Sequence, residues 1–320
     1  MSNVPRRVLR SSSEQQPLVV STRNKYHTIS SSLHTSLAQT LSTQPAPKHE
    51  INIIPRGSNL PNLLPAELKL LHRKQIRLSH DAPKTLASIS SKHLRNALAA
   101  SLIFAQHEAG SAVCIGSAGW VITCAHCFGE TKEEYITSPR TRWLLFYDGR
   151  AVQVECRVWD GKCDLALLKI IAIESYDAST TRGDNNGTSF PFVALSPRMP
   201  AVNTPIICIG QPGSEDLEST TNQKTNYDLV EVSRGSFRGI IPGVNPCDNS
   251  EIGTLKHDAW TYWGHSGAPL LKAMDGNLVG LHSSWDDKTG MRHGVPLVAI
   301  EGFLRDHGEV ISGEFFGRLP

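Results

Sequence analysis

The sequence lacks long apolar runs. No stretch approaches the roughly 18 consecutive apolar residues of a membrane-spanning helix, so we expect no transmembrane segment. The basic start, Met1 to Arg10, is not followed by the apolar core of a secretory signal peptide. With 320 residues, 39% hydrophobic and 19% charged, the chain has globular composition and can form one large or two modest domains. A disulfide-stapled miniprotein is excluded.

Cysteines cannot all pair, because the sequence holds seven of them. This odd number and the missing signal peptide predict a reducing compartment, cytoplasmic or nuclear, with buried free thiols. The start of the chain is poor in acidic residues and rich in Arg and Ser, which leaves mitochondrial import open as the alternative.

Acidic residues are scarce in the first third of the chain. Residues 1–49 hold 10 Ser, 5 Thr and one acidic residue, Glu14, and show no sustained periodicity. Such a segment buries too little apolar surface to offset its ordering entropy, so residues 1–60 are predicted to be a disordered basic arm. Residues 1–96 hold 14 Lys/Arg and 4 Asp/Glu, whereas residues 97–320 hold 18 and 26. The chain therefore has a basic and an acidic part.

Residues 61–100 show helical periodicity and are predicted to be a short helical extension. One helix starts near Pro65, with Leu64, Leu68 and Leu71 on one stripe, and a second starts near Thr85. The first carries a basic cluster, residues 72–77. Because no aromatic residue is interleaved to stack on a base, we interpret this cluster as a solvated helix face and expect no nucleic-acid partner.

After about residue 101 the sequence consists of short β-branched and apolar runs separated by Gly, Pro and Asn. This pattern predicts an all-β region, either a sandwich or a pair of barrels. The runs are residues 102–105, 112–115, 120–123, 143–147, 165–170, 206–209, 229–232, 278–282 and 294–298. A polar stretch, residues 175–189, divides the region into two comparable halves, and no internal repeat of fixed period is present.

Three local motifs carry possible chemistry. They are V-I-T-C-A-H-C, which contains His126, C-D-L-A-L-L, which contains Asp164, and G-H-S-G-A-P-L, which contains Ser266. Each resembles a motif of the trypsin-like serine proteases (T-A-A-H-C, D-I-A-L-L and G-D-S-G-G-P-L). Their joint occurrence in the order His, Asp, Ser within a β-rich region is a specific signal.

This resemblance implies two antiparallel six-stranded β-barrels of the chymotrypsin type. The protease domain would span residues 101–310, with barrel one at 101–178, a linker at 179–190, barrel two at 191–310 and a tail at 311–320. Ser266 would be the nucleophile, His126 the base and Asp164 the residue that orients the imidazole. The backbone N–H groups of Gly264 and Ser266 would stabilise the oxyanion. The resemblance also leaves open a disulfide between Cys114 and Cys127.

Residues 193–305 resemble the HtrA/Deg-type and glutamyl-endopeptidase branches most. I-G-Q-P-G at Ile209 and L-K-H-D-A at Leu255 resemble HtrA segments. Three features depart from the family. His265 occupies the position of the aspartate that pairs with a newly cut N-terminus in trypsin, and no I-V-G-G sequence precedes it. Ala268 replaces a glycine, and we expect no C-terminal PDZ domain, because only a short stretch of sequence follows the last predicted core segment.

The resemblance also bears on specificity. Trp260 stands where trypsin has its pocket aspartate, so cleavage after Lys or Arg is not expected. Thr261 and His282 match pocket residues of glutamyl endopeptidases, and both can donate hydrogen bonds to a carboxylate or carboxamide. We therefore expect a preference for Glu before the scissile bond, with Gln as the second choice. We also expect the backbone of Ser283 to pair with the substrate backbone. A purely structural role of His282, bonded to a backbone carbonyl, stays open.

Other interpretations remain at this point. One is a catalytically silent, protease-like module that recruits a partner through its basic arm, and another is an enzyme held inactive by that arm. Cys124, His126 and Cys127, joined by Cys163, resemble half of a zinc site, but the second C-x-x-C is missing and we expect no metal or cofactor. An α/β-hydrolase is disfavoured by Ala268 and by the chain order. The expected partner is a protein or peptide substrate.

Overall fold

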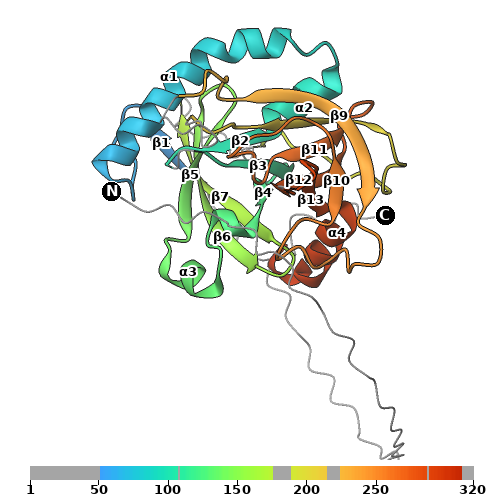
Figure 1. The fold of residues 1–320 in the computed structure, drawn as a ribbon. Helices are drawn as coiled ribbons and strands as arrows, with labels where there is room; N and C mark the ends of the chain where they lie inside the picture. Colours follow the sequence, from blue (N-terminus) through green and yellow to red (C-terminus); the bar gives the residue numbers. More distant parts are fainter. Residues whose placement is uncertain (1–50, 107–108, 176–188, 215–223, 287, 312–320) are drawn as a thin grey trace, which may run out of the picture. The chain divides into compact units, whose positions relative to one another are not determined.

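Strands make up most of the chain from Ser101 onward and close into two barrels (Figure 1). The computed structural model describes residues 51–106, 109–175, 189–214, 224–286 and 288–311. Residues 48–320 form one compact unit, to which the description below applies. No helix among these described segments is long and apolar enough to cross a membrane.

Barrel one is a closed antiparallel sheet in the order β7-β4-β3-β2-β5-β6, with β6 pairing back onto β7. Its strands are β2 (Ser101–Phe104), β3 (Ser111–Gly116), β4 (Trp120–Thr123), β5 (Thr141–Phe146), β6 (Ala151–Asp160) and β7 (Leu165–Ser175). β2, β3 and β4 are buried along their whole length, as their continuous apolar sequences require. Trp143, Phe104 and Phe146 fill the interior.

Barrel two is closed in the order β10-β13-β12-β11-β8-β9. Its strands are β8 (Pro205–Gly210), β9 (Glu231–Ile240), β10 (Leu255–His257), β11 (Pro269–Lys272), β12 (Leu278–Trp285) and β13 (Arg292–Pro296). A separate apolar cluster that includes Cys208, Phe237 and Leu270 fills it. The predicted all-β class with two six-stranded antiparallel barrels is therefore confirmed. The predicted linker at 179–190 lies largely outside the described residues.

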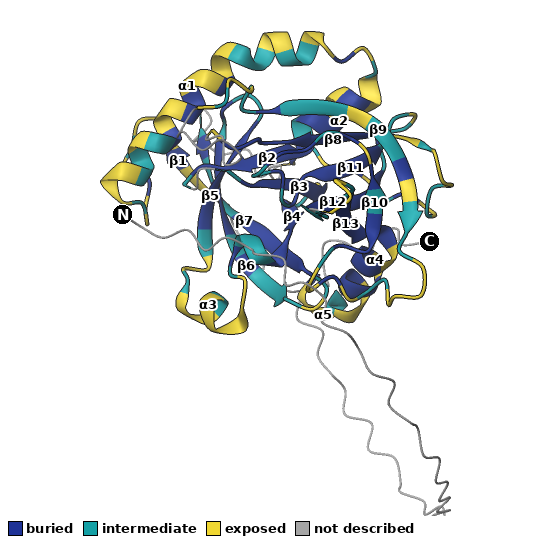
Figure 2. Ribbon diagram, in the orientation of Figure 1, coloured by how far each residue is buried: buried dark blue, intermediate teal, exposed yellow. Residues whose placement is uncertain are grey.

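The N-terminal extension packs onto barrel one. α1 (Pro65–Ala87) begins at a proline in the first turn, and the Glu67 carboxylate accepts a hydrogen bond of 2.7 Å from the Leu64 N–H. Figure 2 shows the strands as buried and much of α1 as exposed. The buried Lys74 donates to the Phe104 carbonyl at 2.7 Å, which anchors the helix on β2.

Two expectations for this extension were wrong. α1 continues past Pro83 to Ala87, so Thr85 belongs to α1, and the second helix, α2 (Lys92–Ala100), begins later behind Ser91. In addition, part of the segment expected to be disordered forms β1 (Asn52–Pro55), which pairs in parallel with β7. The free edge of β7 offers backbone partners that sequence periodicity cannot reveal. Residues 1–50 lie outside the described part.

Short helices complete the unit. η1 (Ala125–Cys127) follows β4 directly, and α3 (Lys132–Thr137) lies in the loop after it, capped by the Thr131 side chain. α4 (Leu297–Asp306) packs against β12 and β13, and α5 (Gly308–Ile311) follows. η1 matters most for the site, because it turns the chain at the end of β4 and carries His126.

Candidate active site

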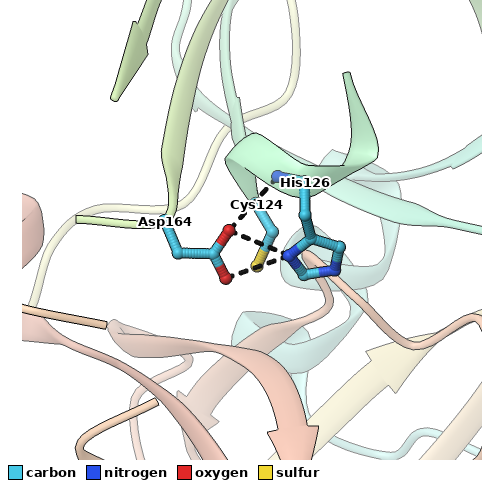
Figure 3. Close-up of side chains that lie close together, drawn as sticks. All are labelled: Cys124, His126 and Asp164. Carbon is cyan, nitrogen blue, oxygen red and sulfur yellow. Dashed lines mark hydrogen bonds and ion pairs between the residues drawn. The ribbon is translucent and has the colours of Figure 1, made fainter. Parts of the chain in front are cut away.

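His126 and Asp164 are brought together by the two neighbouring strands β4 and β7. β4 pairs with β7 up to Thr123↔Ala166, so η1 and the residue before β7 lie at the same end of barrel one. His126 Nδ1 lies 2.8 Å from Asp164 Oδ1 and 3.0 Å from Oδ2, and the His126 N–H donates to Oδ1 at 3.2 Å (Figure 3). The carboxylate therefore fixes the ring and its Nδ1–H tautomer.

Asp164 sits in the left-handed region, with φ of +53°, immediately before β7. Aspartate tolerates this conformation better than most residues. Asp164 is 2% exposed, and its Oδ2 also accepts a hydrogen bond of 2.7 Å from the Ser283 hydroxyl of β12. This bond joins the carboxylate of barrel one to a strand of barrel two.

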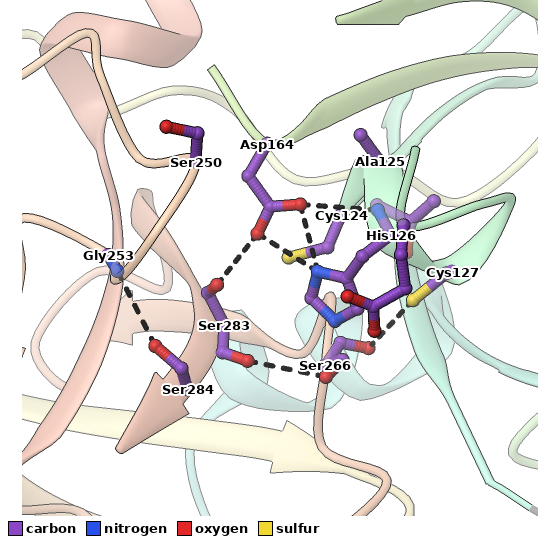
Figure 4. A network of polar contacts seen from close by, with 12 residues as sticks. Cys124, Ala125, His126, Cys127, Asp164, Ser250, Gly253, Ser266, Ser283 and Ser284 are labelled. Atoms are coloured by element: carbon purple, nitrogen blue, oxygen red, sulfur yellow. Dashed lines mark hydrogen bonds and ion pairs between the residues drawn. The ribbon is translucent and has the colours of Figure 1, made fainter. Parts of the chain in front are cut away.

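Ser266 enters the site from barrel two, on the turn before β11. The Ser111 N–H donates to the Ser266 carbonyl at 2.9 Å, and Thr123 Oγ1 in turn donates to the Ser111 carbonyl at 2.7 Å. Ser266 Oγ donates to the Ser283 carbonyl at 3.3 Å. Figure 4 draws Ser266 beside the His126 ring. The structure thus brings together all three residues that the motifs predicted.

Two glycines give the serine loop its shape. Gly264 has φ of +98°, and a Cβ there would lie 2.1 Å from the Ala109 Cβ. Gly267 has φ of +81°, and its Cβ would lie 2.1 Å from the Ser111 carbonyl. Within the described segments, the N–H groups of Gly264 and Ser266 have no hydrogen-bond acceptor. An oxyanion hole needs backbone N–H groups that are free in this way.

The predicted pocket residues are buried next to this loop. Thr261 is 4% exposed, and its Oγ1 has no hydrogen-bond partner among the described residues. His282 is 2% exposed, and its Nδ1 lies 3.0 Å from Nε2 of the equally buried His257. The open alternative, a bond from His282 to a backbone carbonyl, is wrong: its ring partner is His257, which the sequence analysis missed.

His265 replaces the family aspartate without forming an ion pair. The Tyr262 N–H donates to His265 Nδ1 at 3.1 Å, while Nε2 has no partner in the described structure. Burial lowers the pKa of His265 to about 4, so the ring is neutral at pH 7. Trp260 stacks edge-on against this ring, with centroids 5.5 Å apart.

All seven cysteines are free, and four of them are buried. The open disulfide between Cys114 and Cys127 is therefore not formed: Cys114 Sγ contacts the Gly116 carbonyl at 3.2 Å, and Cys127 Sγ contacts the Ser266 carbonyl at 3.8 Å. Burial raises the pKa of both thiols to about 12. Donor atoms of Cys124, His126 and Asp164 lie within 4.8 Å of one another, the one such group in the described segments. The Asp164 carboxylate already engages the His126 ring there.

Two closed barrels, with an imidazole–carboxylate pair on one and a glycine-flanked serine loop on the other, define a chymotrypsin-like peptidase. Residues 110–281, more than half of the chain, match the family model of the trypsin-like peptidase domain. The chain belongs to this family and is a serine protease.

Two solved structures that resemble the chain share little sequence identity with it. An inactive mutant form of Rv3671c from M. tuberculosis is 12% identical, with a TM-score of 0.48, over 73% of this chain and 96% of that one. A serine endoprotease from Yersinia pestis is 18% identical, with a TM-score of 0.47, over 71% of this chain and 69% of that one. No curated protein matches the sequence.

Proposed function

We propose that the protein is a serine endopeptidase that hydrolyses peptide bonds through Ser266, with His126 as base and Asp164 as the orienting carboxylate. The 2.8 Å contact between His126 Nδ1 and Asp164, facing the Ser266 loop, is the observation that supports this most. It leaves His126 Nε2 as the proton acceptor on the side of the serine.

The reaction needs one side-chain rotation. Ser266 Oγ turns from the Ser283 carbonyl toward His126 Nε2, which takes its proton as Oγ attacks the substrate carbonyl. The negative charge that develops on the carbonyl oxygen is stabilised by the N–H groups of Gly264 and Ser266. The imidazolium then protonates the leaving amine, and a water, deprotonated by the same ring, hydrolyses the acyl-enzyme.

The substrate lies extended along the open edge of β12. Pairing between β11 and β12 reaches only Pro269↔Leu281, so no residue of β11 pairs with Ser283 or Ser284. A peptide can add there as a further strand. The side chain before the scissile bond then enters the pocket of Thr261 and His282, whose polar atoms favour Glu and, as the second choice, Gln.

Activity-based labelling tests the nucleophile. A fluorophosphonate probe labels the wild type and the control Ser250→Ala, an exposed serine of barrel two, but not Ser266→Ala. Cleavage of a peptide library by the same three proteins tests the pocket. Folded wild type that stays unlabelled would favour the silent binding module, and dominant cleavage after aromatic or basic residues would refute the Glu or Gln preference.

A further inference from the structure

A row of side chains crosses three strands of barrel two behind the proposed pocket. Arg292 on β13 pairs with His257 on β10 and with Trp285 on β12. Directly opposed residues of antiparallel strands project from the same face, so all three side chains share one face. His282 shares it too, because it pairs with Gly294, two residues after Arg292. The guanidinium therefore projects from the face that carries both histidines.

Arg292 has no acidic partner in the described structure. Its Nε is buried and unpartnered, and its Nη1 makes a long bond of 3.4 Å to the Gly290 carbonyl. The two carboxylates closest to the row along the chain are used elsewhere. Asp258 pairs with Arg238 at 2.7 Å, and Asp286 accepts from Lys288 N–H at 2.9 Å. A buried donor without a partner is costly, by about 1–3 kcal/mol, and its retention calls for a reason.

Other buried polar atoms without a partner belong to this row and to the segment before the nucleophile. Thr261 Oγ1, His265 Nε2 and His257 Nδ1 are all buried without a hydrogen bond in the described segments. His265 directly precedes Ser266. At the other end of the row, Trp285 contacts Trp263, the residue before Gly264, with ring centroids 4.5 Å apart. The ring centroids of His257 and His282 lie 5.2 Å apart and those of His282 and His265 6.3 Å apart, so the histidines connect this row to the nucleophile loop.

The charge of this row comes from Arg292. Burial lowers the pKa of His257 to about 3, of His265 to about 4 and of His282 well below its usual value, and the Arg292 charge lowers all three further. The same charge opposes, without reversing, the rise in pKa of the buried Cys208 thiol. At neutral pH these four groups are uncharged. Lys256 and His293 project from the opposite face, so on β10 and β13 the guanidinium is the fixed charge of this face.

We propose that Arg292 is a specificity-determining residue that binds the carboxylate of an acidic side chain, Glu, before the scissile bond. This rests on the endopeptidase function proposed above and selects between its two candidate side chains. Neutral histidine and threonine donors serve a carboxylate and a carboxamide alike, whereas a guanidinium favours the carboxylate.

The test compares two peptides that differ only by Glu or Gln before the scissile bond. Hydrogen bonds to charged groups predict a wild-type kcat/KM about 10- to 100-fold higher for Glu. Arg292→Gln lowers cleavage of the Glu peptide by that factor, leaves the Gln peptide within about threefold, and is labelled by fluorophosphonate like the wild type. Arg292→Lys keeps part of the preference, and the matched control Arg238→Gln keeps all of it.

The pH dependence of the Glu-to-Gln ratio of kcat/KM distinguishes a role of Arg292 from a role of the histidines. A guanidinium does not titrate between pH 6 and 9, so the Glu-to-Gln ratio stays constant there, whereas a histidine charge would fade above about pH 6.5. This measurement needs only the wild type and so remains decisive even where Arg292→Gln fails to fold. A wild-type ratio near one, a ratio that falls with pH, or an equal loss for both peptides in Arg292→Gln overturns the proposal. Ser266-independent or absent cleavage instead overturns the endopeptidase function itself.

Discussion

The hydroxyl of Ser283 should matter for catalysis through Asp164 and not through the substrate. It donates to Asp164 Oδ2 at 2.7 Å, and the Asp164 side chain is 4% exposed, so water cannot replace the bond in Ser283→Ala. Hydrogen bonds to buried charged groups contribute about 1.5–3 kcal/mol. The same carboxylate orients His126 Nδ1. We therefore expect Ser283→Ala to lower kcat about 10- to 100-fold and the free energy of unfolding by about 1.5–3 kcal/mol.

Ser284→Ala is the matched control. Ser284 neighbours Ser283 on β12, but its Oγ only accepts a weak bond of 3.4 Å from the Gly253 N–H (Figure 4). Urea unfolding gives the stability of both variants, and peptide hydrolysis gives kcat and KM. Since the lost bond does not touch substrate, the effect of Ser283→Ala should fall on kcat and leave KM nearly unchanged. Equal kcat values for the two variants would show that the bond to Asp164 does not support the imidazole.

Three further predictions follow from the same geometry. Gly264→Ala should lower kcat about 10²- to 10³-fold with a smaller effect on KM, because its Cβ would lie 2.1 Å from Ala109 and displace an oxyanion donor; wild-type kinetics would contradict this. Reductant should leave the melting temperature unchanged because all seven cysteines are free, and a clear drop would reveal a disulfide. The free energy of unfolding should decrease as the pH decreases, because burial lowers the pKa of His257 to about 3 and that of His265 to about 4 in the folded protein, against about 6.5 in the unfolded chain. Their contribution is complete above pH 6.5 and is lost as pH falls toward 4, by up to about 1.4 kcal/mol per pH unit for each ring, which urea unfolding at pH 7 and pH 5 measures.

Strands with continuous apolar sequences were the easiest to predict. The runs at residues 112–115 and 120–123 lie within β3 and β4, which are fully buried. β6 was missed although Val152, Val154, Cys156 and Val158 alternate along it, a pattern typical of a strand with one buried face. The run at 294–298 was placed too late, because β13 ends at Pro296 and α4 starts at the next residue. A proline before a helix gives this boundary in retrospect.

The site residues that lie within short sequence motifs could be predicted from the sequence. Each of the residues His126, Asp164 and Ser266 belongs to a short sequence motif, and the structure brings all three together. His257 and Arg292 have no such motif, since their relation to the site comes from strand register between β10, β13 and β12. Register depends on pairing over more than 30 residues of sequence, which periodicity along one strand does not specify.

Part of the positive charge in the first third of the sequence lies on helix α1. The basic helix α1 reaches barrel two, where Arg77 donates to the Tyr227 carbonyl at 2.7 Å and Lys84 pairs with Asp228 at 3.1 Å. Tyr227 in turn packs on Trp260, with centroids 4.9 Å apart, and Trp260 contacts His265 beside the nucleophile. Exposed ion pairs of this kind add little stability each. These contacts link α1 through Tyr227 and Trp260 to His265, the residue before the nucleophile.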